Sequence, residues 1–316
     1  MAFEGGCQAW HYQICITMYT RRNFIKTSGS AAFIGGVTPQ AFIHFSDSPP
    51  LHKKSLKYGM IQESGLSILE KFQLIKDLGF HGVELDSPHD LDESEILDAK
   101  AKTGIEIPGL VNSLHWKKPL SDPDPAVREE CTESMKAAFH QCKKYGGTTV
   151  LLVPAVVNKE VSYGEAWERS TVEIEKMLPA AKETGIKIAI ENVWNNFLLS
   201  PLEATRYVDQ FDSEMIGWYF DVGNVVRYGW PSHWIEALGH RIIKIDVKEY
   251  SRKKQQEEGL WKGFDVELGE GDSDWDLVNK ALKNIGYSGW GSAEVKGGDR
   301  DRLRAISVQM DEIFDR

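Results

Sequence analysis

The sequence places four carboxylates at or near the ends of four successive apolar runs in its second half. They are Glu191, Asp221, Asp246 and Glu294. Carboxylates packed together without partners cost several kcal/mol unless protons or a cation compensate their charge. Hard divalent ions such as Mn²⁺ and Mg²⁺ prefer oxygen ligands. The pattern therefore predicts one divalent ion held by all four. The alternative is that each is an ordinary acid facing solvent or paired with Lys or Arg.

The apolar runs belong to a regular alternation of predicted strands and helices. Most of the helices stop at or near a glycine, as helix C-termini commonly do. Strands are predicted at residues 57–61, 81–85, 105–111, 149–153, 186–190, 215–220, 241–247 and 288–295. Helices are predicted at 67–78, 92–102, 125–145, 163–184, from Pro201 onward, and at 232–238, 274–285 and 300–314.

Eight strand–helix units in about 260 residues favour a single closed (β/α)₈ barrel, a TIM barrel. Strict alternation also permits an open doubly wound sheet, but no G-x-G-x-x-G motif follows the first strand. We expect this barrel to span residues 51–316, after a leader at 1–50. One long connection, residues 248–273, is of the kind that serves a site or is disordered.

In such a barrel the functional site lies at the carboxyl ends of the strands. His115 and Trp116 follow the third strand and are predicted to bind substrate, although local packing of His115 is the alternative. Glu84 ends the second strand and is either a supporting acid or a salt-bridged strand end. Trp194 and Trp261 could line a sugar site, but core or rim packing is the commoner role for each in a chain with ten tryptophans.

The composition is that of a soluble globular protein, with 41% hydrophobic and 27% charged residues among 316. The formal net charge of -10 and the lack of a basic stripe argue against nucleic acid and anionic membrane surfaces as partners. Cys131 and Cys142 fall eleven apart in one predicted helix, so they lie roughly 16 Å apart and beyond disulfide reach.

The leader resembles a twin-arginine export signal at residues 20–26, TRRNFIK. No charged residue follows from 27 to 46, a weak spanning segment but an acceptable export region. We expect translation to start at Met18, export to the periplasm, and no membrane span in the mature protein. The alternative is a tail with a chance arginine pair.

Several motifs resemble the xylose-isomerase-like TIM barrels, and within them the sugar (phosphate) isomerases and epimerases, including the ketose 3-epimerases. They are AIENVWN at 189–195, NNFLLSP at 195–201, FDVGN at 220–224, GEGD at 269–272, GYSGW at 286–290 and SAEVK at 292–296. The resemblance covers about residues 57–314. It implies a (β/α)₈ fold and a metal ion held by Glu, Asp, His and Glu on strands five to eight.

Three of those ligands match Glu191, Asp221 and Glu294, but Asp246 stands in the position of the histidine. This departure gives the ion four carboxylates, or indicates that metal binding is weak or lost. The resemblance also implies that Glu191 and Glu294 move the proton next to a ketose carbonyl. It places Asn224 and Arg252 at positions that bind substrate, although Arg252 also fits a solvated basic run.

The sequence thus predicts a metal-dependent sugar isomerase or epimerase that works through an enediolate. Export favours a free or keto sugar over a phosphorylated one. Two alternatives stay open: a lyase or hydrolase-like enzyme that cleaves keto-glycosides by elimination, and a non-catalytic sugar-binding barrel. A homo-oligomer is also compatible with the sequence.

Overall fold

The computed structural model describes residues 52–315, so the predicted leader with its export signal and Met18 lies outside the described residues. Eight parallel strands form a closed barrel in chain order, which confirms the predicted (β/α)₈ architecture. The ring closes where β1 pairs with β8, with Ser55 opposite Ser292. The strands are β1 His52–Lys57, β2 Gly82–Ser87, β3 Gly109–Asn112, β4 Thr149–Leu152, β5 Lys187–Glu191, β6 Ile216–Asp221, β7 Ile242–Val247 and β8 Gly289–Ala293.

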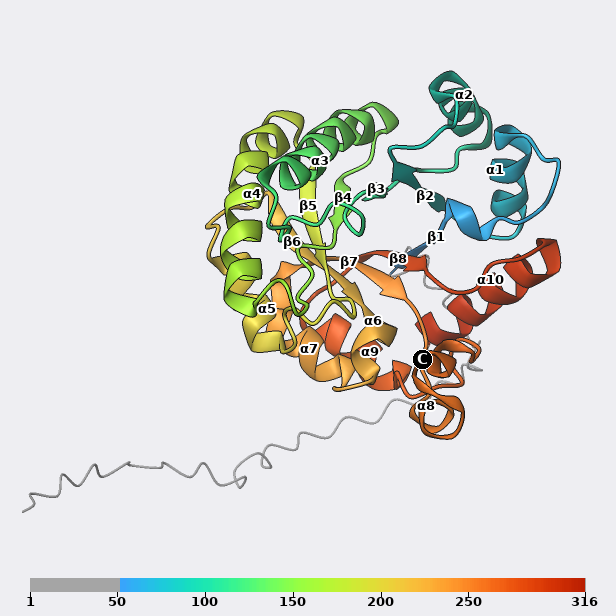
Figure 1. Cartoon of the computed structure of the whole chain (residues 1–316). Coiled ribbons are helices and arrows are strands. Elements are labelled where there is room, and N and C mark those ends of the chain that lie inside the picture. The colour runs from blue at the N-terminus through green and yellow to red at the C-terminus, as the bar shows by residue number, and fades with distance from the viewer. Residues whose placement is uncertain (1–51, 316) are drawn as a thin grey trace, which may run out of the picture. The chain divides into compact units, whose positions relative to one another are not determined.

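Helices surround this ring of strands (Figure 1). They are α1 Ile68–Asp77, α2 Glu93–Thr103, α3 Pro125–Tyr145, α4 Tyr163–Thr184, α5 Pro201–Asp209, α6 Val222–Val226, α7 Pro231–Leu238, α8 Arg252–Glu258, α9 Trp275–Asn284 and α10 Arg300–Phe314. Three short 3₁₀ helices complete the fold: η1 Tyr58–Met60, η2 Gly239–Arg241 and η3 Leu260–Phe264. Among residues 52–315, none of the helices has the length and apolar character needed to cross a membrane.

Local signals in the sequence set most helix boundaries. Ser162 caps α4 with a reciprocal bond to Glu165, which satisfies otherwise unpaired backbone groups at the helix start. Gly104, Gly146 and Gly185 end α2, α3 and α4 with positive φ angles of 76°, 79° and 76°, a conformation that favours glycine. These signals explain why the predicted bounds of α3 and α4 match the structure.

The first strand differs from the prediction of residues 57–61: it runs from His52 to Lys57, and η1 follows it. The polar sequence HKKSLK predicts an exposed segment. In the structure Lys54 is buried against Ser307 and ion-paired with Asp311 of α10. Partners distant in the sequence thus make a lysine-rich strand possible. The connection at 248–273 is also not structureless, because it contains α8 and η3.

Apolar side chains fill the space between the strands and the helices. The barrel interior holds a smaller cluster of Leu151, Ala189 and Tyr219. Cys131 and Cys142 are free and buried, in agreement with the prediction that they form no disulfide.

Candidate active site

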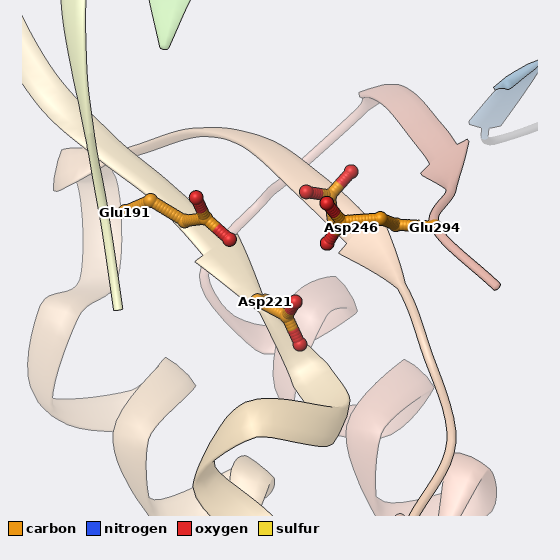
Figure 2. A group of neighbouring side chains, drawn as sticks. All are labelled: Glu191, Asp221, Asp246 and Glu294. Atoms are coloured by element: carbon orange, nitrogen blue, oxygen red, sulfur yellow. The ribbon is translucent and has the colours of Figure 1, made fainter. Parts of the chain in front are cut away.

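The four predicted carboxylates meet at the carboxyl ends of β5 to β8. Glu191 and Asp221 are the last residues of β5 and β6, Asp246 lies near the end of β7, and Glu294 directly follows β8. One oxygen from each lies within 4.8 Å of the oxygens of the other three. Figure 2 shows these side chains pointing toward a common space. The structure therefore brings together the full predicted set.

Strand pairing and helix capping fix the orientation of Asp221. The residue lies opposite Asp246 in the β6–β7 register. Its Oδ1 accepts a 2.8 Å bond from the backbone N–H of Asn224 at the start of α6. The Asn192 side chain holds its backbone, donating to the Asp221 carbonyl at 2.7 Å and accepting from its N–H at 3.0 Å. Oδ2 is therefore the oxygen that faces the cluster.

Lys248 is a member of the site that the sequence reasoning did not select. Its Nζ lies 2.8 Å from Asp221 Oδ2 and 2.6 Å from Glu294 Oε2. Its position two residues after Asp246, just beyond β7, was the available signal. Within residues 52–315 Glu191 has no ion pair, and Asp246 Oδ2 is buried without a hydrogen-bond partner. Compensation by lysine is therefore incomplete.

This unequal compensation separates the pKa values of the carboxyls. Burial, and then the charges of Glu294, Asp246 and Asp221, raise the pKa of Glu191 well above its usual value. Burial raises the pKa of Asp246 in the same way, and it raises the pKa of Asp221 to about 6 despite Lys248. Burial also opposes ionisation of Glu294, but Lys248 and Lys57 overcome it and lower the pKa.

The donor set fits a hard divalent cation. Including Glu84 beneath the cluster, five carboxylates face the ammonium groups of Lys57, Lys244 and Lys248. Two negative charges remain if all are ionised, which is the charge that one divalent ion neutralises. The cluster offers only oxygen ligands, and a buried oxygen of Asp246 has no partner among the described residues. Glu191, Asp221, Asp246 and Glu294 would hold the ion.

A cavity of about 300 Å³ opens beside the cluster. Its lining includes two of the predicted substrate-binding residues, Trp116 and Asn224. The full lining is Trp116, Glu191, Val193, Trp194, Asn224, Lys248, Trp261, Phe264 and Glu294. Asn224 also donates to the Asn192 carbonyl at 3.0 Å, so its side chain is held in place.

His115 and Arg252 lie outside this lining. His115 is buried and its Nδ1 accepts from the Val153 N–H at 3.2 Å, while burial lowers its pKa to about 4. Its ring packs edge-on against Trp116. The Arg252 guanidinium donates to the carbonyls of Val226 and Gly229 at 3.0 and 2.6 Å. The structure thus shows both residues holding neighbouring segments.

Trp194, Trp261 and Phe264 form an aromatic wall of the cavity, so the two tryptophans line it as well as packing against each other. The ring centroids of Trp194 lie 4.9 Å from Trp261 and 4.8 Å from Phe264. Trp194 Nε1 donates to the Asn224 carbonyl at 2.8 Å, which anchors the wall. Trp261 is 68% exposed and Trp116 is 50% exposed, so both present ring surface beside the carboxylates.

The fold and this site match a known class. The model of the xylose isomerase-like TIM barrel family matches residues 72–311, so the chain belongs to that family. Its relatives include L-ribulose-5-phosphate 3-epimerase UlaE of Escherichia coli O1:K1 / APEC, which is 26% identical over 234 residues. That match covers 70% of this chain and 79% of the relative.

Two solved structures share the fold. D-psicose 3-epimerase of Clostridium cellulolyticum H10, solved with D-tagatose, has a TM-score of 0.68 and 16% identity. The match covers 83% of this chain and 98% of that one. The 3-keto-D-glucoside 4-epimerase YcjR of E. coli has a TM-score of 0.70 and 14% identity, and the match covers 84% and 100%. All three relatives are sugar epimerases.

Proposed function

We propose that this protein is a divalent-metal-dependent sugar epimerase or isomerase that abstracts a proton next to a carbonyl and forms an enediolate. The observation that carries the proposal is the pair Glu191 and Glu294, which border one cavity with pKa values shifted in opposite directions. Pairs of titratable groups with separated pKa values mark an acid and a base. A bound ion would polarise the carbonyl and stabilise the enediolate.

The two glutamates divide the proton transfer. Glu294 is the base, because Lys248 and Lys57 keep its carboxylate ionised. Glu191 is the acid, because burial and the charges of three neighbouring carboxylates raise its pKa while that of Glu294 is lowered, so Glu191 holds a proton more strongly than Glu294 does. The base takes the proton from carbon and the acid returns one to the enediolate from another side. β5 and β8 are separated by β6 and β7 around the ring, so the side chains approach the substrate from different directions.

The substrate we propose is an unphosphorylated sugar. The lining contains one basic residue, Lys248, and Asp221 and Glu294 already pair with it. A phosphate held against these lining residues would therefore meet excess negative charge, because the described residues of the lining include no second lysine or arginine. The exposed rings of Trp116 and Trp261 instead suit the apolar face of a neutral sugar ring.

Two further observations bear on the alternatives. An eliminating lyase would use the same base, and its second carboxyl would protonate the leaving group, so the acid–base pair does not separate the two reactions; the relatives favour the epimerase because they are epimerases. A binding barrel without catalysis would not require four convergent carboxylates, whose repulsion destabilises the empty site.

The test is exchange of the α-proton in deuterated water with Mn²⁺-loaded protein. We expect deuterium at the carbon next to the carbonyl, and formation of the epimer or isomer, with free ketoses or keto sugars. The matching sugar phosphates should react more slowly. Sugar binding without exchange would favour the binding barrel, and release of a leaving group would favour the lyase.

We also propose that the protein is exported by the twin-arginine route, from the motif at residues 20–26. Residues 18–50 fused to a reporter should direct it to the periplasm, and replacing Arg21 and Arg22 with Lys should retain it inside. Normal export of the Lys-Lys variant would contradict this proposal.

A further inference from the structure

Lys57 of β1 lies inside the barrel, directly beneath the four carboxylates. Its Nζ is 2.7 Å from Glu84 Oε2, 2.9 Å from Asp246 Oδ1 and 3.1 Å from the Tyr219 hydroxyl. A lysine ammonium has three N–H donors. Lys57 donates hydrogen bonds to Glu84 and Tyr219 and forms an ion pair with Asp246, so its ammonium is engaged by the barrel interior and its role is to hold its neighbours.

The contacts of Asp246 are divided sharply between its two oxygens. Oδ1 takes the ion pair with Lys57 at 2.9 Å and lies 2.9 Å from the Tyr219 hydroxyl, whose one proton is shared between Asp246 Oδ1 and Glu84 Oε2, 2.7 Å away. Oδ2 is fully buried and has no hydrogen-bond partner within residues 52–315. Oδ1 of Asp246 is therefore bound by side chains of the barrel interior, and Oδ2 is the oxygen left for a ligand at the carboxylate cluster.

We propose that Lys57 is a positioning residue that restricts Asp246 to binding a metal ion through Oδ2 alone. Lys57 and Lys244 together offset the charges of Glu84 and ionised Asp246, so Asp246 adds no net charge to the site, as a neutral histidine would at the same point of the ring. This inference rests on the metal-dependent function proposed above. A carboxylate limited to one oxygen favours small, six-coordinate ions over Ca²⁺, which takes six to eight oxygens and often binds both oxygens of a carboxylate.

The preference between Mn²⁺ and Ca²⁺ tests the proposal without measuring turnover. Lys57→Met frees Oδ1, so Ca²⁺ should gain from two-oxygen binding. The ratio of Mn²⁺ to Ca²⁺ affinity, measured by calorimetry on the full chain, should fall by about tenfold, the lower end of the range by which changes in the partners of metal ligands alter metal affinity. The matched control is Lys244→Met, which removes a buried lysine that pairs with Glu84 and not with Asp246. Its ratio should stay at the wild-type value.

Tyr219→Phe covers the case in which Lys57→Met does not fold. It removes the other Oδ1 partner with little change in volume, and should shift the ratio in the same direction by a smaller factor. An unchanged ratio in both variants, or an equal shift in Lys244→Met, overturns the role of Lys57 while the metal site stands. A wild-type chain that binds neither ion overturns the proposed metal-dependent function as well.

Discussion

Two buried glutamates in this barrel have pKa values shifted in opposite directions. Glu84, in the interior, has both oxygens ion-paired, one with Lys244 and the other with Lys57. Burial opposes its ionisation, but these two lysines overcome it and hold the pKa far below the usual value. Glu191, at the mouth, is equally buried but lies beside three carboxylates, and its pKa is raised.

This difference in charge compensation distinguishes a residue that stabilises the fold from one that is available for function. A buried charge whose hydrogen-bonding capacity is filled rigidifies the fold, whereas one left without compensation needs an external proton, ion or ligand. Glu84 belongs to the first kind. Glu191 and Asp246 Oδ2 belong to the second, and they lie where the cavity opens. The carboxylates at the mouth of the barrel are therefore the buried charges that the protein itself does not fully compensate.

The largest effect on stability should come from breaking the ion pairs of Glu84 in the barrel interior. Glu84→Gln leaves Lys244 buried without a carboxylate and Lys57 paired with Asp246 alone, and removal of one partner from a buried ion pair costs about 3–5 kcal/mol of unfolding free energy. Urea denaturation measures it. Glu191→Gln is the matched control: it removes repulsion, so metal-free stability should stay equal or rise. Equal destabilisation by both variants would contradict the comparison.

Catalysis should show the reverse pattern. Glu191→Gln and Glu294→Gln each keep a side-chain oxygen but remove the acid or the base, so turnover should fall at least ~100-fold. Metal content must be measured on the same samples. Asp221→Asn should lose activity through weaker metal binding and recover in part with excess Mn²⁺, whereas the glutamate variants should not. Near-normal proton exchange in both metal-loaded glutamate variants would refute the assignment.

The sequence predicts the barrel because its signals are local. Apolar runs mark the buried strands, and glycines such as Gly146 and Gly185 mark helix ends. The four carboxylates were predictable for the same reason: strand order alone brings strand ends together. The sequence does not predict the strand His52–Lys57, because the burial of Lys54 and Lys57 depends on Glu84, Asp246 and α10, which no local pattern reveals.

The rest of the site depends on side-chain reach and loop geometry. Lys248 lies beside Asp246 in the sequence, but only the fold shows that its ammonium bridges Asp221 and Glu294. Trp194 and Trp261 are distant in sequence and become one wall because η3 places Trp261 against Trp194 at the cavity. Arg252 matched a family spacing, yet its guanidinium is used by backbone carbonyls.

The pH dependence of stability should test the contrast between the compensated Glu84 and the uncompensated carboxylates at the mouth. Burial raises the pKa of Asp221 to about 6, so the stability it contributes is complete below its usual value of 3.8 and is lost as pH rises through about 6. The melting temperature of EDTA-treated protein should therefore fall by about 2 °C or more between about pH 5 and pH 8. Mn²⁺ should cancel this fall, because ionised carboxylates bind the ion more tightly as pH rises. If the melting temperature of the metal-free protein did not change with pH, the carboxylates at the mouth would not be uncompensated, and the contrast with Glu84 would be wrong.

The smallest effect should come from the aromatic wall, which binds sugar but moves no proton. Trp261→Ala removes an exposed ring from the lining, and a ring contact is worth about 0.5–1.5 kcal/mol, so KM should rise about 2–10-fold while kcat changes little. Trp230→Ala is the matched control, since Trp230 is 56% exposed yet lies outside the lining. Steady-state kinetics on the substrate found by proton exchange separates the outcomes. If kcat falls while KM stays constant, Trp261 acts on the carboxylates rather than on the sugar. If Trp230→Ala raises KM equally, exposed tryptophan surface in general binds the substrate, and the cavity does not define the site.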